Sequence, residues 1–169
     1  MADSLRHNSA RKLTDRQRAP IIAAALISGI GFAIFSLFAL ISVWGFTQTL
    51  GVTGILGWVF MLFTVLSFSF LLIVLWTNAE MFVPEAFSKH PVRWQRGRLR
   101  IKMASRERPE MPFSYIVGDY SFAPFLPPQE VPIDKGREYL VYYTPRSRLL
   151  LSIVPTDIDN ITEFLPEDR

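Results

Sequence analysis

The sequence predicts a protein of mixed class, with a two-helix transmembrane hairpin followed by a small antiparallel β module of sandwich or barrel form. Three observations lead to this prediction. Residues 19–79 are 61 consecutive positions without Asp, Glu, Lys or Arg. Eleven of the twelve prolines lie after Glu80, where they interrupt any long helix. Short runs rich in aromatic and β-branched residues, typical of strands, occupy the same region.

Residues 1–18 are a basic leader, and residues 19–79 contain the two predicted helices. Residues 21–46 and 55–76 are apolar stretches, each longer than the ~20 residues that a helix needs to cross ~30 Å of hydrocarbon. The polar, glycine-containing residues 47–54 predict a short loop between them. The first stretch exceeds the ~7–15 apolar residues of a cleaved signal peptide, so we expect an uncleaved helix.

Positive charge flanks the outer ends of both predicted helices. Residues 1–18 contain five basic and two acidic side chains, and residues 89–108 contain eight basic and one acidic side chain. The loop at 47–54 carries no charge. Because cytoplasmic flanks carry an excess of Lys and Arg, both termini are predicted to be cytoplasmic.

Small residues recur every fourth position in the first helix, at Ala25, Gly29 and Ala33. This spacing lets a second helix approach closely. Two interpretations stay open, namely packing within the hairpin and self-association between copies. Neither span contains an ionisable residue, which disfavours a transporter built from this chain alone.

After a juxtamembrane linker at 80–91, expected to form a turn or a short helix broken by Pro84, residues 92–155 form the predicted β module. Strands are expected at Trp94–Ala104 and at four further runs, 113–117, 120–125, 138–143 and 148–154. The run 138–143 is apolar on both faces. The acidic tail at 156–169 is expected to form at most a short amphipathic turn. The predicted core of the module comprises Leu99, Ile101, Val141, Leu149 and Leu151.

A basic stripe is the main candidate for a binding surface. Arg98, Arg100 and Lys102 alternate with apolar residues and therefore share one strand face. The expected site comprises Arg93, Arg96, Arg98, Arg100 and Lys102. It is interpreted as a surface for anionic lipid headgroups or as a docking face for an acidic protein. The nearby aromatic residues are expected in the core rather than stacked on bases, so no nucleic-acid partner is predicted.

The layout resembles a group of uncharacterised bacterial two-helix membrane proteins. The leader at 6–18 reads RHNSARKLTDRQR and precedes the hairpin, and residues 139–153 read YLVYYTPRSRLLLSI. In that group the β module ends in a strand–turn–strand of the form YxVYYxPRSRxLLSI. The resemblance implies a bacterial inner (plasma) membrane protein with a cytoplasmic β module. It implies no activity and supplies no catalytic residues.

The sequence offers little that indicates catalysis. It contains no Cys and only two His residues, His7 and His90, and it lacks a P-loop and a GxGxxG motif. Ser147 has no nucleophile-elbow motif and is interpreted as a turn residue. No catalytic, cofactor-binding or metal-binding residue is therefore predicted. We expect a non-enzymatic membrane-anchored adaptor or scaffold; the alternative is a homo-oligomeric membrane assembly with a conduit or sensing role.

Overall fold

The chain divides into two units, Ile21–Pro84 and a second unit that joins Met1–Pro20 to Glu85–Arg169. The first unit is helical, and the second contains a five-stranded antiparallel sheet. The computed structural model describes residues 2–103, 112–124, 126, 131, 134, 137–158 and 161–165; at 2, 49–53, 103, 112 and 113 it describes the backbone alone.

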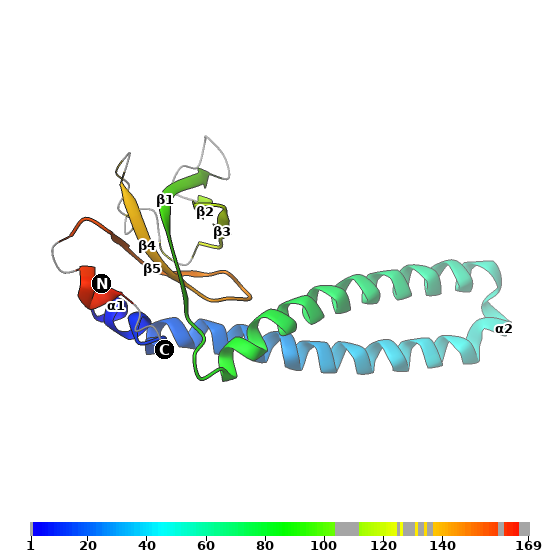
Figure 1. Ribbon diagram of the computed structural model, residues 1–169. Helices are drawn as coiled ribbons and strands as arrows, with labels where there is room; N and C mark the ends of the chain where they lie inside the picture. The colour runs from blue at the N-terminus through cyan, green and yellow to red at the C-terminus, as the bar shows by residue number, and fades with distance from the viewer. Residues whose placement is uncertain are drawn as a thin grey trace. The chain divides into compact units, whose positions relative to one another are not determined.

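Helix α2 runs from Asp15 to Phe87 and reverses direction at Gly54. Gly54 has a φ of 59° and a ψ of −150°, a conformation that a residue with a Cβ rarely adopts. The segments on either side, Asp15–Gln48 and Gly54–Phe87, are each 34 residues long and apolar enough to span a membrane. Figure 1 shows them side by side as an antiparallel pair. The prediction of two long apolar helices is confirmed.

The helical backbone extends further than the sequence indicated. Helical geometry continues through most of the loop predicted at 47–54, and the chain reverses only at Gly54. A helix satisfies its own main-chain donors and acceptors, whereas a loop leaves them unpaired. Extending the helices therefore shortens the loop between them. At the other end α2 continues past Pro84, where a break was expected, and ends at Phe87. Pro84 removes one main-chain hydrogen bond, and the helix ends three residues later.

Aromatic contacts fix the register of the two helical segments. The ring centroids of Phe32 and Trp76 lie 5.3 Å apart, and those of Phe46 and Phe60 lie 5.5 Å apart. A Cβ added to Gly31 would lie 3.2 Å from Leu75. Gly31 therefore lets the segments approach closely within the hairpin, as small residues do in packed membrane helices.

The five strands follow the predicted positions closely. Their order in the sheet is β3-β2-β1-β4-β5, and all pairs of neighbours are antiparallel. The sheet is open, although an isolated bridge joins Ala123 to Leu149 beyond the two edge strands. The expected closure into a sandwich or barrel stays a prediction. The strands are β1 (Arg93–Met103), β2 (Pro112–Val117), β3 (Tyr120–Phe122), β4 (Glu138–Tyr143) and β5 (Leu150–Pro155).

Strand β4 contributes to two hydrophobic cores because successive side chains point to opposite faces. Tyr139 and Val141 belong to a core shared with β2, β3 and β5, whereas Leu140 and Tyr142 belong to a second core on the other face. The second core also contains Leu5 of helix α1 (Ala2–Ser9). The pattern of apolar residues on both faces of 138–143 thus has a direct structural cause.

The leader and the tail complete the second core. Asn8 of α1 is buried and donates a hydrogen bond from Nδ2 to the Ser152 hydroxyl at 2.7 Å. The Tyr142 hydroxyl donates to the main-chain oxygen of Phe164, which lies in the 3₁₀ helix η2 (Ile161–Phe164). Burial raises the pKa of Tyr142 to about 12. The short turn predicted in the acidic tail corresponds to η2, whose Ile161 and Phe164 pack against the second core.

The predicted core residues differ in their burial. Val141 and Leu151 are buried, as expected. Leu99, Ile101 and Leu149 are only half-buried and pack at the margins of the two cores. The reason in β1 is that β4 pairs with Arg93–Arg98, whereas the residues from Leu99 onward pair with β2 alone in the described registers.

Candidate functional site

Four basic side chains follow one another at every second position of β1. Leu99 and Ile101, between them, pack against the first core, which turns the basic side chains to solvent. Arg96 forms a salt bridge with Glu138 of the neighbouring strand β4, with Nη2 2.9 Å from Oε2. We call this surface the basic strand face; it comprises Arg96, Arg98, Arg100 and Lys102, all of which are exposed.

Arg93, the fifth predicted residue, belongs to the opposite face. It pairs in register with Tyr143. Burial raises the pKa of Tyr143, and the positive charge of Arg93 offsets only part of that rise. Tyr143 packs against the first core, with its ring centroid 4.7 Å from that of Phe122. Arg93 was grouped with the other four because it is close to them in sequence. Since side chains alternate along a strand, it lies on the face opposite to theirs.

The predicted helix-approach stripe is also divided. Ala25 is buried and Ala33 is exposed. A Cβ added to Gly29 would meet nothing within 4 Å, whereas the neighbouring Gly31 is the glycine that contacts Leu75. Packing within the hairpin therefore uses Gly31, and Gly29 leaves open space on the helix surface.

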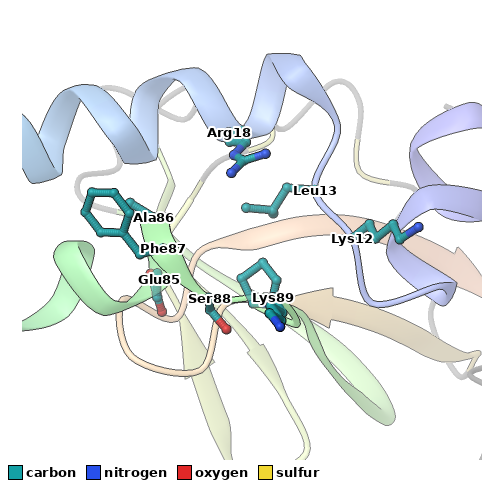
Figure 2. A pocket seen from close by; sticks show the side chains of 9 residues that line it. Lys12, Leu13, Arg18, Glu85, Ala86, Phe87, Ser88 and Lys89 are labelled. Atoms are coloured by element: carbon teal, nitrogen blue, oxygen red, sulfur yellow. The ribbon is translucent and has the colours of Figure 1, made fainter.

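A pocket of about 350 Å³ lies where the leader meets the end of α2. None of the five basic residues predicted from the sequence lines it. Figure 2 shows Leu13 and Arg18 on one side of the pocket and the end of α2 on the other, with Lys12 to one side. The residues that line it all belong to the unit containing the sheet and are Lys12, Leu13, Arg18, Glu85, Ala86, Phe87, Ser88, Lys89 and Pro91.

The leader side of the pocket is held by a capping box. Thr14 Oγ1 accepts a hydrogen bond from the Gln17 main-chain nitrogen at 3.4 Å, and Gln17 Oε1 accepts one from the Thr14 nitrogen at 3.1 Å. The buried Gln17 amide then donates from Nε2 to the main-chain oxygen of Leu151 at 3.0 Å. One side chain thus fixes the start of α2 and attaches it to β5.

The opposite side is held by Glu85, which is buried near the C-terminus of α2. Its Oε1 accepts hydrogen bonds from the main-chain nitrogens of Arg146 at 2.6 Å and Ser147 at 2.9 Å. Its Oε2 accepts one from the Ser147 hydroxyl at 2.6 Å. The carboxylate is therefore directed at the turn between β4 and β5, and we call this set of contacts the Glu85 anchor.

The turn is shaped to receive the carboxylate. Thr144 Oγ1 lies 2.6 Å from Ser147 Oγ and accepts a hydrogen bond from the Leu149 nitrogen at 3.0 Å. Arg148 has a φ of 53°, which turns the chain back into β5. Ser147 is a turn residue, as predicted, but no pattern in the sequence indicates its hydrogen bond to a glutamate 62 positions away.

The pocket was not predicted from the sequence, because its three basic residues, Lys12, Arg18 and Lys89, were interpreted only as topology signals. One sequence feature could have indicated it: Lys12 and Arg18 precede the first span and Lys89 follows the second, so an antiparallel hairpin brings these positions to the same end. No group of three or more His, Cys, Asp or Glu side chains placed to hold a metal ion occurs within the described ranges.

Comparisons of the chain with protein-family models, with curated proteins and with solved structures found no match. The resemblance to bacterial two-helix membrane proteins therefore stays a prediction, and the functional argument depends on the chain's own chemistry.

Proposed function

We propose that this chain is a non-enzymatic membrane-anchored adaptor or scaffold of the bacterial inner membrane. The two apolar segments of α2 cross the bilayer, and both termini lie in the cytoplasm. Two helices of spanning length support the anchor, and the excess of basic residues beside both spans supports the orientation. In this arrangement the β module works at the membrane surface.

The basic strand face is the surface through which the adaptor acts. The observation that carries the proposal is the exposure of Arg98, Arg100 and Lys102 in one row on β1. Like charges on neighbouring positions repel one another and add little stability, so the fold itself does not require them. Such a row attracts anionic headgroups or an acidic protein, and the attraction weakens as salt screens it.

Replacing Arg98, Arg100 and Lys102 by Glu should strongly weaken binding to anionic vesicles. Each basic residue contributes about 1 kcal/mol at an anionic surface, so three reversals should weaken binding by at least about 100-fold. The measurement is vesicle flotation of a soluble version in which a Gly/Ser linker replaces residues 21–84, with the leader kept because α1 contributes to the second core.

Phosphatidylcholine vesicles with and without phosphatidylglycerol, at low and high salt, provide the comparison. The unaltered soluble version should float only with the anionic vesicles at low salt. Equal flotation with both vesicle types would exclude lipid as the ligand of this face. The acidic-protein interpretation would then be tested by co-purification of the full chain and its triple-Glu variant from native membranes.

The orientation can be tested with single cysteines, since the chain has none of its own. Cysteines at the exposed positions Asp3, Gln48 and Thr162 sample the two ends and the reversal. In intact cells, an impermeant thiol reagent should label only the Gln48→Cys variant, and permeabilised cells should show labelling of all three. Labelling of Asp3→Cys or Thr162→Cys from outside would show that the proposed orientation is wrong.

A homo-oligomeric assembly with a conduit or sensing role is the second candidate, and the open space beside Gly29 favours it. Gly29→Leu fits a single hairpin but blocks close approach by another helix. The variant should shift the mass in lipid nanodiscs from oligomer to monomer. Gly45→Leu is the matched control, because a Cβ there also meets nothing within 4 Å. Identical masses for all three proteins would exclude this interface.

A further inference from the structure

We infer that the pocket between the leader and the end of α2 binds a phosphate group of the kind carried by anionic phospholipids. The inference deepens the proposed function and rests on it, because the membrane anchor is what brings lipid phosphate to this pocket. It concerns residues distinct from the basic strand face.

The charges around the pocket favour an anion. Lys12, Arg18 and Lys89 line it, and all three side chains are exposed. None of the ion pairs found among the described residues involves them. A guanidinium fork and two ammonium groups at one concavity are a donor set suited to phosphate oxygens.

The one carboxylate in the lining does not oppose this binding strongly. The Glu85 oxygens accept three hydrogen bonds from the turn at Arg146 and Ser147. These donors hold the carboxylate toward the turn.

The remaining lining suits a lipid better than a free ion. Leu13, Ala86, Phe87 and Pro91 supply apolar surface beside the cations. Phe87 is 79% exposed at the last position of α2. Arg18 lies only three residues before Ile21, where the apolar stretch begins. Cations next to apolar side chains match the junction between a phosphate headgroup and its glycerol ester region.

The test uses the full chain in detergent micelles, with native mass spectrometry as the readout of bound lipid. The probes are dihexanoyl phosphatidylglycerol and inorganic phosphate. The pocket variant carries Lys12→Gln, Arg18→Gln and Lys89→Gln. The matched control carries Arg6→Gln, Arg16→Gln and Arg148→Gln, which removes the same charge from exposed positions outside both the pocket and the basic strand face.

We expect the pocket variant to bind phosphatidylglycerol about 100-fold more weakly than the unaltered chain, since each lost cation accounts for about fivefold. The control should stay within about threefold, because its charges lie outside the pocket and act only through screened long-range attraction. A single Lys89→Gln change, with an expected loss of about fivefold, provides a milder variant should the triple variant unfold.

The two probes distinguish the sources of phosphate. Pocket-dependent binding of phosphatidylglycerol that millimolar inorganic phosphate does not displace assigns the site to lipid. Pocket-dependent binding of inorganic phosphate with equal affinity assigns it to free phosphate and overturns the lipid assignment. Equal lipid binding by the unaltered chain and the pocket variant overturns the inference altogether.

Failure of the inference and failure of the proposed function give different results. If the pocket variant keeps phosphatidylglycerol while the triple-Glu variant of the basic strand face loses anionic vesicles, the pocket assignment is wrong and the adaptor proposal stands. If the pocket binds lipid but the cysteine labelling places the termini outside the cytoplasm, the proposed function is wrong and the pocket assignment stands.

Discussion

Replacing Glu85 by Ala should lower the free energy of unfolding of the β module by about 3 kcal/mol. The change leaves the nitrogens of Arg146 and Ser147 and the Ser147 hydroxyl without their acceptor. A buried polar group without a partner costs about 1–3 kcal/mol. Three such groups would together cost about 3–9 kcal/mol. Water entering through the neighbouring pocket should hydrogen-bond to some of them, which keeps the expected loss of stability near about 3 kcal/mol.

The measurement is hydrogen exchange of the main-chain amides of β4 and β5 in the full chain in detergent micelles, from which the free energy of unfolding is obtained. Glu85→Gln should lose about half as much, because its amide keeps one acceptor oxygen but loses the charge. Glu163→Ala is the matched control, since that exposed glutamate only approaches Arg6 at 3.9 Å and should change stability by less than about 0.5 kcal/mol. Equal exchange in the Glu85→Ala and Glu163→Ala variants would contradict the Glu85 anchor.

Replacing Leu151 by Ala should destabilise the module by about 3 kcal/mol. Leu151 is 1% exposed and belongs to the second core with Leu140 and Tyr142. Truncation of a buried leucine loses apolar burial and leaves a cavity, at a typical cost of ~2–5 kcal/mol. For a domain of this size, such a loss lowers the melting temperature by more than about 10 °C.

Thermal unfolding of the full chain in detergent, followed by near-ultraviolet circular dichroism, measures this change. Leu165→Ala is the control, because Leu165 is 46% exposed in the same module and its truncation should shift the melting temperature by only about 1–3 °C. A Leu151→Ala variant that melts with the unaltered chain would show that the second core does not stabilise the module.

Local sequence patterns determined the elements of this protein. The uncharged run from 19 to 79 specifies two apolar helices, because its length and composition need no information from distant residues. Alternation along β1 placed Leu99 and Ile101 inward and Arg98, Arg100 and Lys102 outward, as the structure has them. The predicted runs at 113–117, 120–125, 138–143 and 148–154 coincide closely with the remaining four strands.

The pairing of distant segments was decided only by the tertiary structure. The leader residues Leu5 and Asn8 contribute to the module's second core and to a bond with Ser152, yet a short polar helix carries no pattern that names its partner. Glu85 lies 62 residues from Ser147, and the pocket joins Lys12 and Arg18 to Lys89. Periodicity reports which face of an element is buried, whereas contacts between segments depend on how buried donors, acceptors and apolar surfaces are satisfied together in the folded chain.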